Sequence, residues 1–153
     1  MRILLIYPDC EQAQNDHTNS RALAEPLALE YLAAVAKQEK SDVFIFDMRL
    51  EPSALEQIIT SYSPELVGVT SHASFYTNSI ICICDKIKEI YPDCLISIGG
   101  HHATFMPKDF FRSSVDFVVT GQGLQAFRMI IQAYGTKQSF ESIPETWVRT
   151  RNG

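Results

Sequence analysis

Five apolar runs rich in β-branched residues are spaced along the chain, and helical patterns separate them. The runs that we expect to form strands are residues 2–7, 42–47, 66–71, 94–98 and 117–120. The helical patterns cover residues 26–40, 52–62, 75–91, 106–111 and 125–134. Strands that alternate with helices pair in parallel, and the connecting helices cover both faces of the sheet. The sequence therefore predicts an α/β fold with a doubly wound, five-stranded parallel sheet.

Composition limits the classes of protein to which the chain can belong. Its 153 residues suit one domain. Of these residues, 46% are hydrophobic and 20% are charged, which excludes a disordered or collagen-like chain. A net charge of −5 argues against nucleic acid as a partner, because such partners need a surplus of positive charge. We expect no signal peptide, no membrane span and a cytoplasmic location. The four cysteines lack zinc spacing, so buried, reduced thiols are expected.

The last eleven residues read differently from the rest of the chain. Asn152-Gly153 favours a hairpin turn, so residues 146–150 are expected to form a strand whose partner would follow. We therefore assign residues 1–142 to the domain and residues 143–153 to the start of a hairpin or linker.

Small and hydroxyl-bearing residues follow three of the predicted strands. Ligands of doubly wound sheets bind beyond the carboxyl ends of the strands, where the strand order reverses. Residues 70–74 (TSHAS), 99–104 (GGHHAT) and 120–123 (TGQG) all follow strands. Small residues let a ligand approach the backbone closely, and hydroxyls and amides offer uncharged hydrogen bonds. These loops would suit a large, flat ligand with polar edges.

Each loop also has a simpler explanation. Gly99-Gly100 can be a tight turn, and a metal site at His101 and His102 is disfavoured because no further ligand is placed nearby. Ser71 beside His72 lacks the elbow motif of hydrolases. Residues 121–126 (GQGLQA) match a dinucleotide-binding pattern, but no acidic residue follows on a further strand. The sequence lacks the residues expected of a receiver domain or of a flavin mononucleotide site.

Taken together, the blocks make the chain resemble the N-terminal cobalamin-binding domain of radical S-adenosylmethionine enzymes, in the group of the anaerobic Mg-protoporphyrin monomethyl ester cyclase and related Fe-S oxidoreductases. The resemblance rests on the segments ILLIYP (3–8), PLALEYLAAVA (26–36), PELVGVTS (64–71), IGGHHATFMP (98–107) and VDFVVTGQGLQA (115–126). It spans residues 2–153. The blocks at residues 98–107 and 115–126 are the most specific, in this order and at this spacing.

The resemblance implies a Rossmann-like fold that binds cobalamin across the strand ends, with its nucleotide tail in a groove beside the sheet. Carried over by position, the residues that it places at the cofactor are Pro8, Thr70, Ser71, His72, Gly99, Gly100, His101, His102, Ala103, Thr104, Gly121, Gln122 and Gly123. Related domains carry D-x-H-x-x-G, whose histidine ligates cobalt, and the segment around His17 lacks its Asp and Gly. Base-off cobalamin with no protein ligand to cobalt is therefore expected.

The resemblance also implies a larger enzyme. The cofactor module would present cobalamin to a radical S-adenosylmethionine barrel that follows it in the same polypeptide, with a [4Fe-4S] cluster, S-adenosylmethionine and a small-molecule substrate. Methyl transfer or ring cyclisation would be the reaction, and no catalytic residue is assigned to this chain. Gln122 and Leu124 replace two acidic residues usual in the family, and the cluster-binding C-x-x-x-C-x-x-C is absent from the sequence. A degenerate module that binds no cofactor and serves in assembly or gating is the alternative, with a nucleotide-binding domain ranked last.

Overall fold

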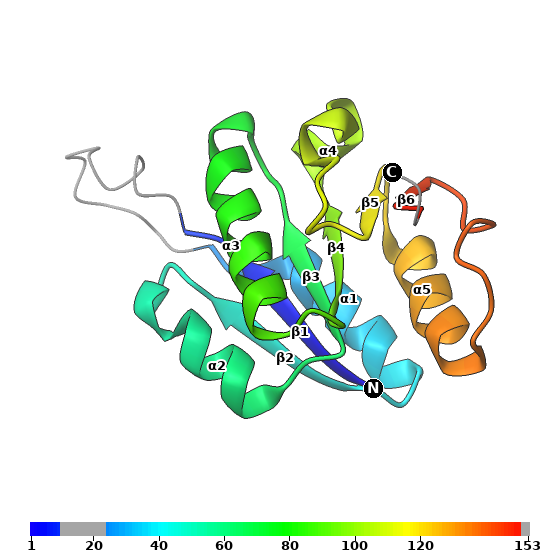
Figure 1. Ribbon diagram of the computed structural model, residues 1–153, viewed down its shortest axis with the longest axis horizontal. Helices are drawn as coiled ribbons and strands as arrows, with labels where there is room; N and C mark the ends of the chain where they lie inside the picture. Colours follow the sequence, from blue (N-terminus) through cyan, green and yellow to red (C-terminus); the bar gives the residue numbers. More distant parts are fainter. Residues whose placement is uncertain (10–23, 151–153) are drawn as a thin grey trace.

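One six-stranded sheet, in the order β2-β1-β3-β4-β5-β6, organises the computed structural model, which describes residues 1–9 and 24–150 (Figure 1). The strands are β1 (Arg2–Tyr7), β2 (Asp42–Asp47), β3 (Leu66–Thr70), β4 (Leu95–Gly99), β5 (Phe117–Val119) and β6 (Thr146–Val148). The α-helices are α1 (Leu27–Gln38), α2 (Leu55–Tyr62), α3 (Thr77–Ile90), α4 (His101–Phe105) and α5 (Leu124–Thr136). Short 3₁₀ turns are η2 (Pro52–Ala54), η3 (Ser74–Tyr76) and η4 (Pro107–Phe110).

The first five strands pair in parallel, as predicted. Leu5 lies between Ile45 of β2 and Gly68 of β3, and Gly68 in turn pairs with Ser97 of β4. The order changes direction after β2, so the sheet is doubly wound and Rossmann-like. Carboxyl ends of all five strands consequently meet at one edge, which is where the small-residue loops begin.

Two apolar cores, one on each face, hold the helices to the sheet. One face packs against α2, α3 and η4 and contains Ile6, Val69 and Ile98. The other packs against α1 and α5 and contains Leu5 and Phe117. In Figure 1, α2 and α3 lie in front of the sheet and α1 lies behind it. Alternate residues of each strand therefore serve opposite cores.

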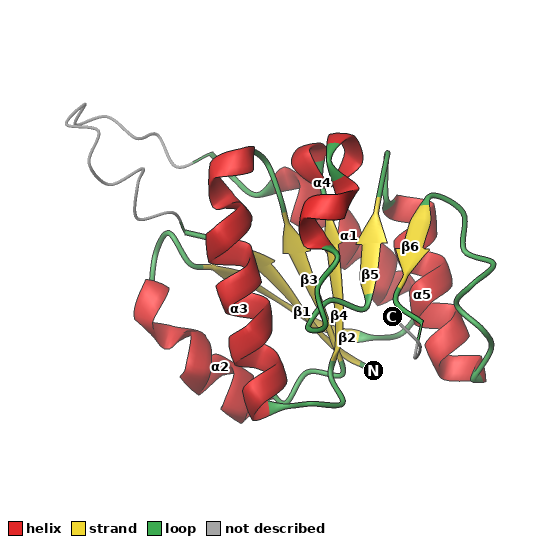
Figure 2. Cartoon of the chain, turned by 45° about the horizontal axis from the view of Figure 1, so that its top comes forward, coloured by secondary structure: helices red, strands yellow, loops and turns green. Residues whose placement is uncertain are grey.

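The structure corrects the expected path of two segments. The residues after β4 were expected to form a loop, but His101–Phe105 form helix α4, and the predicted helix at 106–111 is the 3₁₀ turn η4. Gly100 makes this change of direction at φ +115°, a conformation that side chains rarely allow. The strand predicted within residues 146–150 is confirmed as β6, and it adds a sixth strand to the sheet, which was predicted to have five. Figure 2 shows β6 beside β5, and the pairing is antiparallel, with Trp147 opposite Val118.

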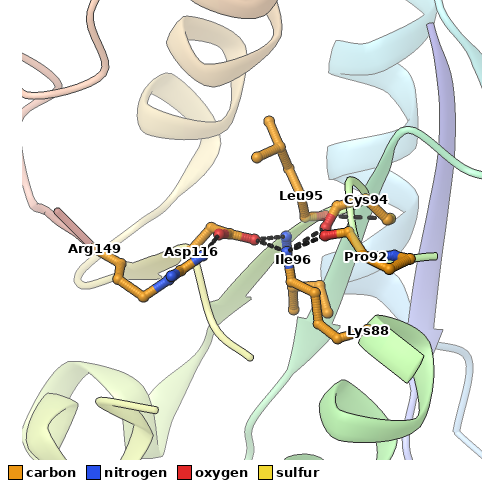
Figure 3. Close-up of polar contacts among 7 residues, drawn as sticks. All are labelled: Lys88, Pro92, Cys94, Leu95, Ile96, Asp116 and Arg149. Carbon is orange, nitrogen blue, oxygen red and sulfur yellow. Dashed lines mark hydrogen bonds and ion pairs between the residues drawn. The ribbon is translucent and has the colours of Figure 1, made fainter. Parts of the chain in front are cut away.

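A buried carboxylate holds β6 to the rest of the sheet (Figure 3). Asp116 accepts hydrogen bonds from the backbone N–H of Ile96 at 2.8 Å and from the Arg149 guanidinium at 2.6 Å. Lys88 Nζ, from α3, lies 2.8 Å from the same carboxylate and also donates to the Cys94 carbonyl. Three separate segments thus meet at Asp116, and its buried negative charge is paired with two cations.

The described residues contain no helix that is long and apolar enough to cross a membrane.

Candidate functional site

A groove of about 320 Å³ lies between α1 and α5, above the carboxyl-terminal halves of β3, β4 and β5. Its lining residues come from all five of these elements and from the turns that follow β4 and β5: Ala28, Leu29, Tyr31, Leu32, Gly68, Val69, Thr70, Ser97, Gly99, Gly100, Val119, Gly121, Gln122, Gly123, Leu124 and Phe127. The volume is within the range of small-molecule sites.

The groove exists because side-chain size falls along one face of two adjacent strands. On the α1 and α5 face, β3 begins with Leu66 and β4 begins with Leu95, and both belong to the apolar core or pack against it. The next residues on that face are Gly68 and Thr70 in β3, and Ser97 and Gly99 in β4. Large side chains therefore fill the space between sheet and helices at one end, while small ones leave it open at the other.

The walls of the groove are apolar. Leu29 of α1, Val119 of β5 and Phe127 of α5 are each at most 5% exposed and face the space from opposite sides. At the rim, Tyr31 is 56% and Leu124 38% exposed. A ligand that enters the groove thus moves from a mixed, solvent-exposed rim into an apolar interior.

The turn after β4 brings two strand ends into close contact. A Cβ added to Gly100 would lie 2.7 Å from the Ser71 carbonyl oxygen and 3.0 Å from the Ser71 nitrogen. The Ser71 N–H donates to the Gly99 carbonyl at 2.7 Å, and the His102 N–H donates to the Ser71 carbonyl at 3.0 Å. Only glycine fits at position 100, because both the positive φ and the neighbouring backbone exclude a side chain.

A second turn is tied to the first. The Thr104 hydroxyl donates to the Gly100 carbonyl at 2.8 Å and accepts from the Gly121 N–H at 3.0 Å. Gly121 has φ +69° and Gly123 has φ +60°, so the chain can turn sharply from β5 into α5. The loops after β4 and β5 therefore form one connected edge of the groove.

The structure brings six of the sequence-predicted cofactor residues together in the groove. They are Thr70, Gly99, Gly100, Gly121, Gln122 and Gly123. Pro8, Ser71 and Ala103 are buried and do not line the groove, and Ala103 belongs to the core on the opposite face of the sheet. The Ser71 hydroxyl is fully enclosed without a hydrogen-bond partner. The side chain of Thr104 serves the turn described above rather than the lining.

The three described histidines do not line the groove. His102 Nε2 lies 2.8 Å from Asp109 Oδ2, and the His101 ring lies 4.9 Å from that of Phe105, so α4 and η4 hold both rings locally. Among residues 1–9 and 24–150, no group of three His, Cys, Asp or Glu side chains could hold a metal ion. His17 lies outside the described residues.

His72 belongs to a stack at the ends of β1, β2 and β3. Its ring centroid lies 4.8 Å from that of Tyr7, and the Arg49 guanidinium lies 3.8 Å from the Tyr7 ring centroid on a cation–π contact. Asp47 accepts from Arg49 Nε at 2.8 Å, which holds the pKa of Asp47 below its usual value. Desolvation, with the charges of Arg49 and His101, lowers the pKa of His72. Burial therefore favours the neutral form of the His72 imidazole.

Sequence reasoning missed the floor and one wall of the groove. Gly68 lies inside a strand, where glycine weakens the sheet unless another group approaches closely. Ser97 is a hydroxyl in an otherwise apolar strand and is 4% exposed. Both were visible as exceptions to the apolar pattern of their strands. The residues of α1 that form the wall gave no such signal, because they follow the ordinary pattern of an amphipathic helix.

Comparisons with known proteins agree with this architecture. The profile of a family described as the B12 binding domain matches residues 18–131. An uncharacterized methyltransferase of Pyrococcus horikoshii is 30% identical over 94% of this chain, and an anaerobic magnesium-protoporphyrin IX monomethyl ester cyclase of Rubrivivax gelatinosus is 28% identical over 87%. This chain covers 31% and 24% of these two relatives, respectively.

A solved structure shares the fold. The radical S-adenosylmethionine methyltransferase TsrM of Kitasatospora setae superposes on 99% of this chain with a TM-score of 0.80 and 21% sequence identity. The matched region is 29% of the TsrM chain. The chain thus spans a third or less of the length of each of these proteins.

Proposed function

The chain belongs to the B12-binding domain family, and from that premise we propose that the groove between α1 and α5 holds the nucleotide tail of cobalamin. The corrin ring would then lie across the carboxyl ends of the strands. The observation that carries the proposal is the coincidence of a groove with a small-residue floor and a connected rim of glycine turns. Both features lie at the edge where ligands of doubly wound sheets bind.

The residues present fit such a group. Gly68 and Gly99 contribute no side chain to the floor, and Gly100 lets the backbone turn away from the ligand space. Thr70 and Ser97 supply hydroxyls for the polar atoms of the tail. Gly121 to Gly123 would close the far side of the tail, next to the start of α5. Cobalamin bound there would supply a cobalt centre that can carry a methyl group.

The histidines that follow the strands would border the corrin ring. His72, His101 and His102, with Thr104, lie in the segments that leave the carboxyl edge of the sheet, where an amide-fringed ring could contact them. We expect base-off cobalamin without a protein ligand to cobalt, since the segment around His17 lacks the complete ligand motif. The domain would then bind the cofactor through its tail and its ring edge.

The chain would act as the cofactor module of a larger enzyme. Its relatives are about three to four times as long as the region that matches, and the solved relative TsrM is a radical S-adenosylmethionine methyltransferase. We expect a barrel with a [4Fe-4S] cluster and S-adenosylmethionine to be its partner in the same polypeptide. Methyl transfer to a small molecule, or ring cyclisation, would be the reaction. A cytoplasmic location, where thiols stay reduced, agrees with that chemistry.

A direct binding experiment tests the proposal. The purified chain is mixed with hydroxocobalamin, passed through a desalting column, and its visible spectrum is recorded. Retained colour with a base-off spectrum is expected. A colourless protein fraction would instead support the degenerate module without a cofactor. Stabilisation by NAD or flavin mononucleotide in a melting experiment would support the nucleotide-binding alternative.

A further inference from the structure

Helix α4 is joined to the turn after β5 through one threonine hydroxyl. The Gly121 N–H donates to Thr104 Oγ1 at 3.0 Å, across 17 residues of the sequence. Thr104 lies in α4, and Gly121 begins the turn that leads into α5. This contact therefore holds two different strand-to-helix connections at a fixed separation.

The same hydroxyl is oriented from within its own helix. Thr104 Oγ1 donates its proton to the Gly100 carbonyl at 2.8 Å, and the Thr104 N–H donates to that carbonyl at 3.0 Å. A hydroxyl has one proton and two lone pairs, so a lone pair is left to accept from Gly121. Threonine has few side-chain rotamers in a helix, and the bond to the carbonyl four residues earlier selects one of them. The hydroxyl thus has no proton left to donate to a ligand.

The turn between β5 and α5 depends on this link for its position. The Thr120 N–H donates to the Glu145 carbonyl at 2.8 Å, so the chain is held up to the end of β5. Beyond that point Gly121 has φ +69° and Gly123 has φ +60°. Glycine loses more conformational freedom than any other residue when its backbone is fixed. A turn with two glycines is therefore costly to order, and Thr104 supplies a bond that orders it.

Helix α4 depends on the link less than the turn does. The His102 N–H donates to the Ser71 carbonyl at 3.0 Å, and the Ala103 side chain is buried in the core under α3 and η4. These contacts fix α4 to the end of β3 and to the sheet. Loss of the Thr104 hydroxyl would consequently release the β5–α5 turn and leave α4 largely in place.

We propose that Thr104 is a positioning residue that couples the part of the site facing the corrin ring to the part enclosing the nucleotide tail. The inference rests on the proposed function, in which α4 borders the ring and residues 121–123 close over the tail. Thr104 acts on the cofactor through these two segments, because its hydroxyl proton is already engaged. Binding to a turn that is already ordered costs less entropy. A corrinoid with a nucleotide tail therefore benefits from the link more than one without a tail.

A pair of corrinoids and three variants test this coupling. Equilibrium dialysis with the 153-residue chain measures dissociation constants for cobalamin and for cobinamide, which lacks the nucleotide tail. Thr104→Val keeps the shape of the side chain and removes both hydrogen bonds, whereas Thr104→Ser keeps the hydroxyl. Thr60→Val is the matched control, because Thr60 Oγ1 also donates to the carbonyl four residues earlier, at 2.8 Å, and does not line the groove.

The two corrinoids should respond differently. We expect Thr104→Val to weaken cobalamin binding by about fivefold and cobinamide binding by less than about twofold. Thr104→Ser should restore the affinity for cobalamin, and Thr60→Val should leave both affinities unchanged. A merely structural role would weaken both corrinoids equally, and that result would overturn the inference. Failure of the serine variant to restore cobalamin binding would overturn it as well.

The link can also be measured without any corrinoid. NMR follows the exchange of the Gly121 N–H with water in the unchanged chain and in the two Thr104 variants. We expect this exchange to be faster by about threefold or more in Thr104→Val alone. Equal rates in the three forms would overturn the inference. Failure of the unchanged chain to bind either corrinoid would contradict the proposed function itself, whereas the inference alone fails if cobalamin binds and Thr104→Val binds it equally well.

Discussion

Substitution of Gly68 by alanine separates the binding role of the groove floor from the stability of the sheet. A Cβ at this position would lie 2.8 Å from Leu5 Cδ2 and 3.7 Å from Phe127 Cε2, on the face that lines the groove. Leu5 is fully buried, so its side chain must shift within the core. The new methyl group would also raise the floor beneath a bound nucleotide tail.

The magnitudes differ for folding and for binding. Alanine in place of glycine inside a strand raises the free energy of unfolding by about 0.5–1 kcal/mol, because alanine loses less backbone entropy on folding. Crowding of a packed core costs about 1–3 kcal/mol. The net loss of about 1 kcal/mol corresponds to a fall of about 2–4 °C in Tm for a domain of this size. Cobalamin binding is expected to weaken by roughly tenfold, because the tail loses its contact with the floor.

Thermal melting and equilibrium dialysis with cobalamin measure the two effects on the same samples. Gly135→Ala is the matched control, since Gly135 lies in α5 and a Cβ there would meet nothing within 4 Å. This control should gain about 0.5–1 kcal/mol in stability and bind cobalamin normally. Unchanged cobalamin affinity in the Gly68 variant would refute the assignment of this groove to the tail.

Three further predictions concern the framework of the site. Gly100→Ala should lower the free energy of unfolding by about 2–4 kcal/mol, because φ at this position is +115° and the new Cβ would lie 2.7 Å from a backbone oxygen. Urea titration measures this loss, and a loss below about 1 kcal/mol would contradict the prediction. Asp116→Ala should lower the free energy of unfolding by about 3 kcal/mol in the same assay, because it leaves the ammonium of Lys88 without its carboxylate. An unchanged free energy of unfolding would show that these charges contribute nothing to stability. The pKa of Asp47 is lowered by its hydrogen bond to Arg49, so its contribution to stability is complete above the ordinary value of 3.8 and is lost as the pH falls through the lowered value. The free energy of unfolding should therefore fall less steeply with acid in Asp47→Asn than in the unchanged chain. Identical acid profiles would refute this.

The sequence by itself determined the order of the elements and the edge at which the site lies. Apolar runs separated by helical patterns predict parallel strands, and the carboxyl ends of parallel strands meet at one edge. Thr70, Gly99 and Gly121 were placed together on this reasoning, and the structure brings them into one groove. The glycines entered this prediction because small residues allow close approach to the backbone, and the structure adds that Gly100 has a conformation accessible to few other residues.

Only the tertiary structure decided which face of the sheet carries the groove and what forms its depth. A strand pattern shows that alternate residues face opposite sides, but not which helix packs above each one or at what distance. The floor at Gly68 and Ser97 and the wall from α1 depend on that packing, as does the helix at His101–Phe105. The direction of β6 was likewise set by pairing with β5, because an edge strand takes its orientation from its neighbour.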